Sequence, residues 1–332
     1  MSAPAHVGPR LLCLGELLVD MVPSEPGASL TEARAYLWAA GGAPANVAVA
    51  AARLGTPSAV VAAVGDDPFG AALVAELERA GVVASDVVRL PRPTAVAFVA
   101  LGAAGERDFL FYGHDPAHDH LDPERAVAAV RRLADAGEGA RCLHFGSVCL
   151  ARDPAREATA AAIAAARAGG WLVSCDVNVR TAFWADLDEA RAVIGRFAAE
   201  ADVVKLSAEE AAFLAGGSGD AAEAELTDAL LKGRARVVVI SRGADGATAY
   251  AWGYRVDAPA PRVPSVDTTG AGDALTGALL AATLTRPGTW DDAAGAQAAL
   301  ERACAFAALT TTRRGAIPAY PDAAALEAFL SG

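Results

Sequence analysis

Short apolar runs alternate along the chain with segments of helical character. Apolar runs of this length are typical of strands buried inside a sheet. Strands that alternate with helices predict an α/β fold, with a mainly parallel sheet sandwiched by helices. The predicted strands are residues 11–14, 60–64, 142–145, 171–175, 203–206 and 237–240, and the main predicted helices are 44–54, 69–80, 155–168, 187–199 and 222–231.

One region departs from this alternation. Residues 94–101 and 107–112 have strand character on either side of the turn 102–105, and no helix follows them. This pattern predicts a β-hairpin. The length of 332 residues allows one large α/β domain or two ordinary ones. Because we find no linker, low-complexity tract or internal repeat, we expect a single domain spanning residues 1–332.

Composition and charge narrow the range of functions. Apolar residues make up 54% of the chain, but no uninterrupted apolar run reaches the ~20 residues of a membrane span. The N-terminus lacks a secretory pattern, so we expect a cytoplasmic protein. The net charge of −12 argues against nucleic acids and anionic membranes as partners, since both require a basic surface.

The cysteines are odd in number and have no Cys-x-x-Cys spacing. Most of them lie in apolar, strand-like segments, which is typical of buried structural thiols in a reducing compartment. Disulfides or a zinc site are less consistent with this spacing. The five cysteines are Cys13, Cys142, Cys149, Cys175 and Cys304.

Residues 267–274 (Asp-Thr-Thr-Gly-Ala-Gly-Asp-Ala) lead directly into an apolar stretch and predict an anion site at a helix start. Gly270 and Gly272 allow a turn tight enough for successive N–H groups to converge, and the helix adds its positive end. Asp273, beside a bound phosphate, is suited to take a proton from an attacking hydroxyl. The alternative is a capped helix with Asp273 as a dipole partner. The string is neither a P-loop nor a dinucleotide fingerprint, and it indicates a kinase.

A second glycine motif occurs near the start of the chain. Gly41 and Gly42 precede a predicted helix that has Pro44 in its first turn and Gly55 at its end. Asn46 places an amide close to the start of this helix. The amide is either a local helix cap or, together with the glycines, a contact for sugar hydroxyls.

Both motifs, in this order, resemble the two signatures of the PfkB (ribokinase-like) family of carbohydrate kinases, and within that family the chain is most similar to fructokinases. The resemblance covers nearly the whole chain and implies a ribokinase-like fold. It also implies a small β lid, formed by segments of about 16–40 and 92–113, that closes over the sugar, excludes water and joins two copies in a homodimer. Further matching segments are 14–20, 64–70, 176–180, 205–210, 241–246 and 314–318.

The resemblance implies a sugar site built from several segments. Asp20 would accept two sugar hydroxyls, because a carboxylate at the end of an apolar strand needs partners. An exposed aspartate at a strand end is the alternative for this residue. The implied sugar-binding residues are Asp20, Gly41, Gly42, Asn46 and Arg180.

Arg180 follows Asp176 and Asn178 at alternating spacing. If the segment is extended, the three side chains lie on one side. The resemblance places Arg180 near the substrate or the transferring phosphate, for which a planar cation is suited. An ordinary surface ion pair is the alternative.

The resemblance also implies two nucleotide segments. In the first, Lys205, Ser207 and Glu210 lie at the edge of the nucleotide site, and Glu210 is associated with magnesium through water. Ser207 stands where many relatives have asparagine, and a helix cap formed by Ser207 and Glu210 is the alternative.

In the second segment, Ser241, Gly243 and Gly246 match a turn where glycines let the backbone approach the nucleotide. A plain hairpin turn is the alternative. The implied cofactors are ATP and Mg²⁺, and the resemblance also places a monovalent cation such as K⁺ near Asp267 and Thr269.

The predicted reaction is transfer of the ATP γ-phosphoryl group to a sugar primary hydroxyl, with Asp273 as the base. The N–H groups of the turn that holds Gly270, Ala271 and Gly272 would stabilise the phosphoryl charge. D-fructose, giving fructose 6-phosphate, is the predicted substrate. Alternatives are 2-keto-3-deoxygluconate, a nucleoside, and a sugar-binding regulator without catalysis.

The choice of sugar depends on the lid. Relatives that act on the keto acid carry an arginine after two aromatic residues, whereas here Gly113 follows Phe111 and Tyr112. A carboxylate substrate therefore loses an ion-pair partner, which favours neutral fructose. Fructokinase-like relatives often carry an arginine there too, so Gly113 departs from both patterns. We expect the neighbouring His114 to be a solvent-facing loop histidine; a metal site formed with His118 and His120 is the alternative.

Overall fold

A nine-stranded sheet forms the centre of the computed structural model, which describes residues 8–25, 27–101, 107–135 and 139–332. The strand order is β13-β12-β11-β10-β9-β8-β1-β4-β5. The strands from β11 to β5 are parallel. Beyond β11 the sheet continues with two antiparallel pairings, β11 with β12 and β12 with β13, and β13 is the edge strand. All six predicted strands are confirmed within this sheet. The bounds are β1 Leu11–Leu14, β4 Ser58–Gly65, β5 Val83–Leu90, β8 Cys142–Gly146, β9 Leu172–Asp176, β10 Val203–Ser207, β11 Val237–Ser241, β12 Ala247–Ala251 and β13 Tyr254–Ala258.

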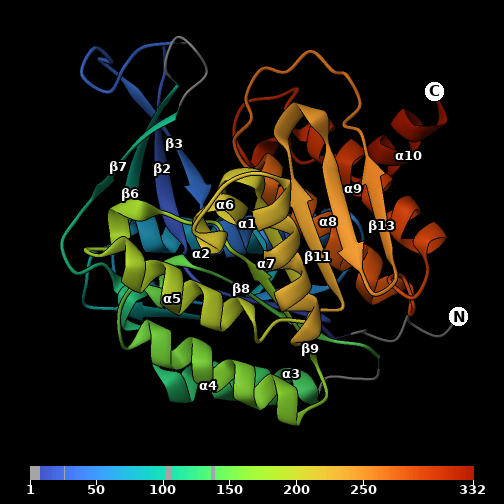
Figure 1. Ribbon diagram of the computed structural model, residues 1–332. Coiled ribbons are helices and arrows are strands. Elements are labelled where there is room, and N and C mark those ends of the chain that lie inside the picture. Colours follow the sequence, from blue (N-terminus) through green and yellow to red (C-terminus); the bar gives the residue numbers. More distant parts are fainter. Residues whose placement is uncertain (1–7, 26, 102–106, 136–138) are drawn as a thin grey trace, which may run out of the picture.

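Helices cover both faces of the sheet (Figure 1), and strands such as β1 and β4 are therefore buried along their whole length. One apolar core lies between the sheet and α1, α2, α8, α9 and α10, and a second lies between the sheet and α3 to α7. The predicted helices agree with the observed ones within two residues at each end. The bounds are α1 Ala43–Arg53, α2 Pro68–Arg79, α3 Pro123–Ala134, α4 Ala155–Ala168, α5 Leu187–Ala198, α6 Ala208–Ala215, α7 Asp220–Lys232, α8 Ala271–Thr285, α9 Ala293–Thr310 and α10 Ala323–Ser331.

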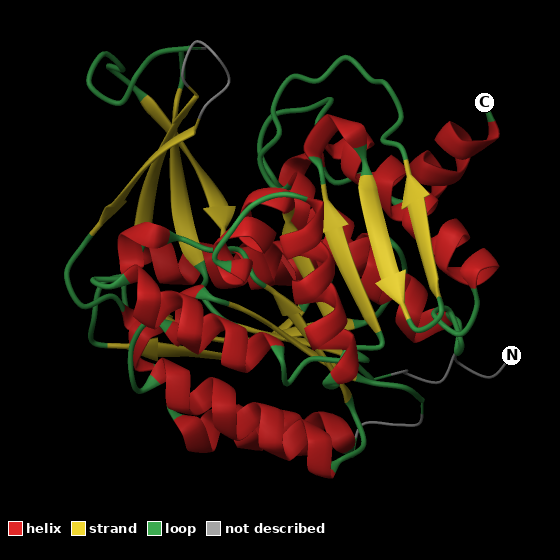
Figure 2. Cartoon of the chain, in the orientation of Figure 1, coloured by secondary structure: helices red, strands yellow, loops and turns green. Residues whose placement is uncertain are grey.

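A separate four-stranded sheet projects from one end of the molecule (Figure 2), in the order β3-β2-β6-β7. Its strands are β2 Leu18–Pro23, β3 Tyr36–Gly41, β6 Val96–Leu101 and β7 Arg107–Tyr112. The predicted hairpin is confirmed, because β6 and β7 pair antiparallel. Its turn, residues 102–105, lies outside the described residues. We call this four-stranded sheet the lid.

Three further predictions concern the cysteines, the histidines near His114 and membrane spans. All five cysteines are buried and free, as predicted. His114 is exposed, and the described residues contain no group of three or more His, Cys, Asp or Glu side chains arranged to hold a metal ion. Within the same residues, every helix is too short or too polar to cross a membrane.

Candidate active site

The first turn of α8 forms the predicted anion site. Gly270 caps the helix with φ 74°, a left-handed conformation that favours glycine. The N–H of Ala271, predicted to face the anion, donates instead to the carbonyl of Thr268 at 3.2 Å. No carbonyl among the described residues accepts from the N–H groups of Gly272 and Asp273. Two N–H groups at the positive end of α8 are therefore open to an anion.

Asp273 lies in this first turn and is held by α1. The side-chain amide of Asn46 donates to its Oδ2 at 2.8 Å. Burial of the carboxylate and the negative charge of Asp176 raise the pKa of Asp273. The Asn46 hydrogen bond and the positive charges of Lys205 and Arg180 act in the opposite direction. The net effect is a carboxylate more basic than an exposed aspartate, as a general base requires.

A cavity of about 80 Å³ lies between the lid and the first turn of α8. It brings together most of the residues predicted for the sugar site. Gly41 lies outside the lining, and a Cβ at this position would collide with the carboxylate of Asp20. Gly41 therefore makes room for Asp20 rather than facing the cavity itself. The lining consists of Glu16, Leu18, Asp20, Gly42, Ala43, Asn46, Ala97, Phe111, Val148, Asn178, Arg180, Phe183, Thr269, Gly270 and Asp273.

Glu16 is a lining residue that the sequence reasoning missed. Its Oε1 accepts from the N–H of Ala43 at 3.0 Å. Its Oε2 and the Oδ1 of Asn46 are buried, and no described residue donates to either atom. Burial raises the pKa of Glu16 to about 7, against the hydrogen bonds from its own N–H and from that of Ala43. Two buried acceptors without donors favour a ligand that carries hydroxyl groups.

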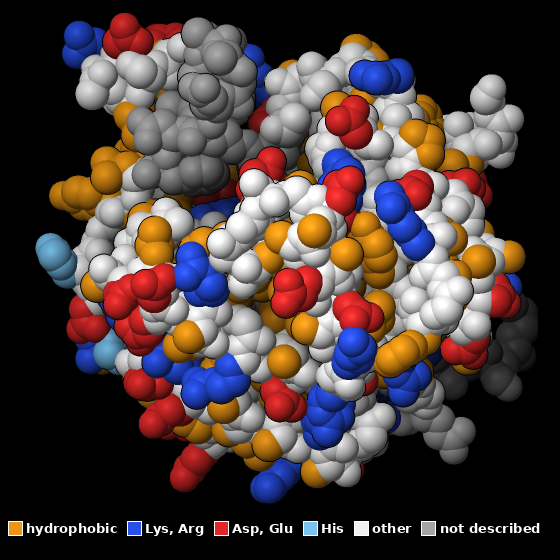
Figure 3. All heavy atoms as spheres, viewed as in Figure 1, with side chains coloured by type: hydrophobic (Ala, Val, Ile, Leu, Met, Phe, Trp, Pro, Cys, Tyr) orange, Lys and Arg blue, Asp and Glu red, His pale blue; other side chains and the backbone are white. Residues whose placement is uncertain are grey.

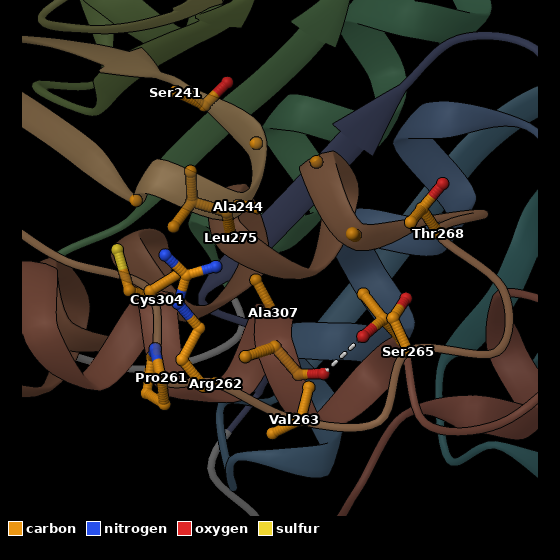
Figure 4. Close-up of a pocket in the computed structure, with 17 residues that line it drawn as sticks. Ser241, Ala244, Pro261, Arg262, Val263, Ser265, Thr268, Leu275, Cys304 and Ala307 are labelled. Atoms are coloured by element: carbon orange, nitrogen blue, oxygen red, sulfur yellow. Dashed lines mark hydrogen bonds between the residues drawn. The ribbon is translucent and has the colours of Figure 1, made fainter. Parts of the chain in front are cut away.

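A larger cavity, of about 270 Å³, lies on the other side of the same turn (Figure 4). Ser241, Gly243 and Gly246 line it, as predicted for the nucleotide segment. The alternative, a plain hairpin turn, is also confirmed, because the segment that contains these residues joins the antiparallel strands β11 and β12. The other lining residues are Ala244, Ala260, Pro261, Arg262, Val263, Ser265, Thr268, Ala271, Gly272, Leu275, Cys304, Ala307, Ala308 and Thr311.

One turn thus separates the two cavities. Thr268, Ala271 and Gly272 face the larger cavity, whereas Thr269, Gly270 and Asp273 face the smaller one. A polyphosphate in the larger cavity and a hydroxyl compound in the smaller one would meet at the start of α8. This arrangement is suited to phosphoryl transfer.

Residues 9–323 match the family model described as pfkB family carbohydrate kinase. The chain belongs to this family. Fructokinase-1 of Oryza sativa subsp. japonica is 40% identical to this kinase over 314 residues, which are 94% of each chain. Fructokinase-1 of Zea mays is 40% identical over 317 residues, 95% of each chain.

Solved structures of kinases are similar to this chain in fold. The fructokinase from Vibrio cholerae O395, in its fructose-, ADP- and calcium-bound form, matches this kinase with a TM-score of 0.86 and 34% identity, covering 97% of this chain and 99% of that one. Aminoimidazole riboside kinase from Salmonella enterica, complexed with aminoimidazole riboside and an ATP analog, has a TM-score of 0.81 and 33% identity, with the same coverage. These similarities confirm the predicted ribokinase-like fold.

The predicted nucleotide edge of this kinase lies where β10 runs directly into α6. Lys205 is 6% exposed and lies outside the lining of the larger cavity, where we had predicted a nucleotide edge. Ser207 and Glu210 form a capping box, with Ser207 N–H to Glu210 Oε2 at 2.8 Å and Glu210 N–H to Ser207 Oγ at 3.2 Å. Glu210 Oε1 also accepts from the N–H of Val179 at 2.9 Å. The helix-cap interpretation is confirmed, and the magnesium role stays a prediction.

The Asp-x-Asn-x-Arg segment is not extended, so the condition under which its three side chains would lie on one side is not met. Asn178 has φ 33°, in the left-handed region, and the chain turns at this residue. Asp176 is therefore buried at the end of β9, while Asn178 and Arg180 face the smaller cavity. The turn separates the side chains that the alternating spacing had placed together.

Asp267 and Thr269 lie together where the predicted monovalent cation site would be. Asp267 Oδ1 accepts from the N–H of Thr269 at 2.9 Å and from its hydroxyl at 2.6 Å. Asp267 Oδ2 accepts from the N–H of Gly315 at 2.8 Å. These bonds fix the loop before α8, and cation binding stays a prediction.

Replacing Gly277 by alanine should reduce stability and activity together, because α1 and α8 touch at this glycine. A Cβ there would lie 2.5 Å from the Cβ of Ala50, so the helices must separate. We expect a loss of about 1–3 kcal/mol in the free energy of unfolding. Separation of α1 from α8 should also lengthen the hydrogen bond between Asn46 and Asp273, and kcat should therefore fall. Urea unfolding and steady-state kinetics would measure both effects.

Gly195 provides the matched control for this substitution. It lies in α5, and a Cβ there would meet nothing within 4 Å. Gly195→Ala should stabilise the protein by about 0.5–1 kcal/mol, since alanine is the better helix former, and should leave kcat unchanged. Native stability and native kcat in Gly277→Ala would contradict close packing of α1 on α8.

Proposed function

We propose that this kinase transfers the γ-phosphoryl group of ATP to the primary hydroxyl of D-fructose and forms fructose 6-phosphate. The observation that carries the proposal is the single turn, residues 268–273, that lines both cavities. The larger cavity would hold ATP, with its phosphates toward the start of α8. The smaller cavity, closed by the lid, would hold the sugar.

In this proposal Asp273 orients the sugar hydroxyl and takes its proton. The N–H groups of Gly272 and Asp273 stabilise the charge on the transferring group. Arg180 reaches the same space from the segment after β9 and adds a positive charge. Arg262 is the one cation among the described residues that line the larger cavity.

We also propose that the kinase uses Mg²⁺, held through water by Glu210, and a monovalent cation. Both oxygens of Glu210 already accept backbone N–H groups, and each keeps lone pairs that can accept from a water ligand of Mg²⁺. The residues thus fit water-mediated rather than direct coordination. Bound Mg²⁺ would supply neutralisation of the phosphate charge. Asp267 and Thr269 would serve a monovalent cation such as K⁺.

A neutral polyol suits the smaller cavity better than a keto acid. Its described lining contains three carboxylates, Glu16, Asp20 and Asp273, and Arg180 as the one cation. A substrate carboxylate would be repelled by this excess of negative charge, whereas hydroxyl groups can donate to it. The fructokinase names among the relatives point to the same substrate.

The unit of function in this proposal is one kinase domain of residues 1–332, with lid segments of about 16–40 and 92–113. Pairing of two lids in a homodimer would cover apolar side chains that are exposed on the single chain. Figure 3 shows hydrophobic side chains along the outer edge of the lid. Among the described side chains of the lid strands, the large apolar ones that are exposed are Leu37, Trp38, Leu110 and Tyr112.

The deciding experiment is a coupled ADP-release assay with magnesium ATP and four acceptors: fructose, 2-keto-3-deoxygluconate, ribose and adenosine. We expect turnover with fructose to exceed turnover with the others. Turnover with the keto acid alone would show that the three carboxylates of the smaller cavity do not exclude an anionic substrate. Turnover with no acceptor would favour a sugar-binding regulator.

A further inference from the structure

A buried ion pair lies directly beneath the first turn of α8. The Nζ of Lys205 donates to Oδ1 and Oδ2 of Asp176 at 3.1 and 3.0 Å. The hydroxyl of Thr276, on α8, lies 3.0 Å from Asp176 Oδ2 and 3.0 Å from the carbonyl oxygen of Gly272. Lys205 and Asp176 are 6% and 1% exposed. The network therefore connects the ends of β9 and β10 to the turn that separates the two cavities.

Gly272 shows how closely the ammonium approaches this turn. Its φ lies outside the left-handed region, so backbone conformation does not require glycine there. A Cβ at Gly272 would instead lie 3.1 Å from the Nζ of Lys205. The glycine leaves space for the ammonium group against the backbone of the phosphate site.

We propose that Lys205, Asp176 and Thr276 form a positioning network that fixes the first turn of α8 and holds the ammonium group of the ion pair against the backbone of the phosphate site. This inference rests on the proposed phosphoryl transfer and assigns none of the three residues a contact with substrate. A buried ion pair contributes little net stability compared with apolar residues of the same size. The position of this pair beneath an anion site is better explained by its field and its geometry.

The charges around Asp273 define what the network does to the base. Asp176, Glu16 and Tyr320 are acidic groups whose charges interact with Asp273, Asp20 lines the same cavity, and Lys205 and Arg180 are the neighbouring basic groups. The positive charge of Lys205 lowers the pKa of Asp273 and the negative charge of Asp176 raises it.

Lys205 has charged and titratable neighbours of its own. The negative charges of Asp176, Glu210 and Asp273 raise its pKa against the effect of burial. His144, on β8, also faces the pair, and its burial lowers its pKa. Lys205 therefore stays charged across the pH range in which Asp273 titrates.

The test compares Lys205→Met, Asp176→Asn and the variant carrying both, with the acceptor that the wild type uses best. We expect each single substitution to lower kcat by about tenfold or more, with the acceptor KM within about twofold. The acid limb of the kcat–pH profile should move to higher pH in Lys205→Met and to lower pH in Asp176→Asn. In the double variant it should return toward the wild-type position.

Lys232→Met is the matched control, because it breaks an exposed ion pair with Asp228; kcat and the pH profile should not change. If a single variant fails to fold, Thr276→Val removes only the hydroxyl and should lower kcat at unchanged acceptor KM. The proposal would be overturned if the acid limbs of the kcat–pH profiles of Lys205→Met and Asp176→Asn moved in the same direction. Unchanged kcat in Thr276→Val would also overturn it.

The failure of the proposed function can be told apart from failure of this inference. A wild type that turns over no acceptor overturns phosphoryl transfer. Affinity for magnesium ATP, measured by calorimetry, still tests the network in that case. A positive charge behind the phosphate site requires weaker binding in Lys205→Met, and equal affinity would reject it.

Discussion

Asp273→Asn should lower kcat by about 10²–10⁴-fold, the usual contribution of general-base catalysis. This corresponds to about 3–5 kcal/mol of transition-state stabilisation. Asparagine keeps the shape of the side chain and an acceptor for Asn46, but it cannot take a proton. The loss should therefore appear in kcat, while the affinity for ATP, measured by calorimetry, stays close to that of the wild type.

The control for this variant is Asp228→Asn, an exposed carboxylate on α7 that pairs with Lys232. It should leave kcat unchanged, since surface substitutions of this kind are usually silent. Near-normal turnover in Asp273→Asn would exclude Asp273 as the base. A joint loss of turnover and ATP affinity would indicate that the carboxylate holds the first turn of α8 instead.

Glu16→Gln should make the sugar-free protein more stable at pH 8. The pKa of Glu16 is raised from 4.5 to about 7 in the folded chain, so the folded state keeps its proton while the unfolded chain releases it. Stability therefore falls as the pH rises from about 4.5 to about 7. Above that range the penalty is about 3 kcal/mol, at 1.36 kcal/mol per pKa unit. Glutamine has no charge and avoids the penalty.

Urea unfolding at pH 5 and pH 8 would measure this effect. Glu16→Gln should gain up to about 3 kcal/mol at pH 8 and less than about 1 kcal/mol at pH 5. The exposed Glu225→Gln should change stability by less than about 0.5 kcal/mol at either pH. Equal effects of Glu16→Gln at the two pH values would show that burial does not hold the proton on Glu16.

The same variant should bind sugar less well at pH 8. A charged acceptor contributes about 1.5–3 kcal/mol to a hydrogen bond, more than a neutral amide does, so we expect KM for fructose to rise about tenfold. A gain in stability together with a loss of affinity would place Glu16 in the sugar site. An unchanged KM would place it outside.

Sequence reasoning was most accurate where one local rule decides the structure. The left-handed turn at Gly270 and the capping box of Ser207 with Glu210 follow from short-range chemistry. Strand and helix positions follow from apolar runs that the sheet and its two helix layers bury.

The missed features depend on contacts between distant segments. Gly272 looks like a conformational glycine, but its neighbour is an ammonium from β10, far away in sequence. Glu16 follows a buried strand, and its carboxylate is desolvated by contacts with distant segments such as the start of α1. The left-handed Asn178 redirects Arg180, and the alternating polar spacing contains no sign of that turn.

The hydrogen bond between the side chains of Asn46 and Asp273 joins residues 227 positions apart in the sequence. Synthesis on the ribosome runs from the N-terminus, so the lid strands and α1 emerge long before α8. An unfinished chain can contain many of the residues that line the smaller cavity, but it lacks the turn at the start of α8 that would face ATP. Phosphoryl transfer must therefore wait for the last part of the chain, and an incomplete product of translation would not consume ATP.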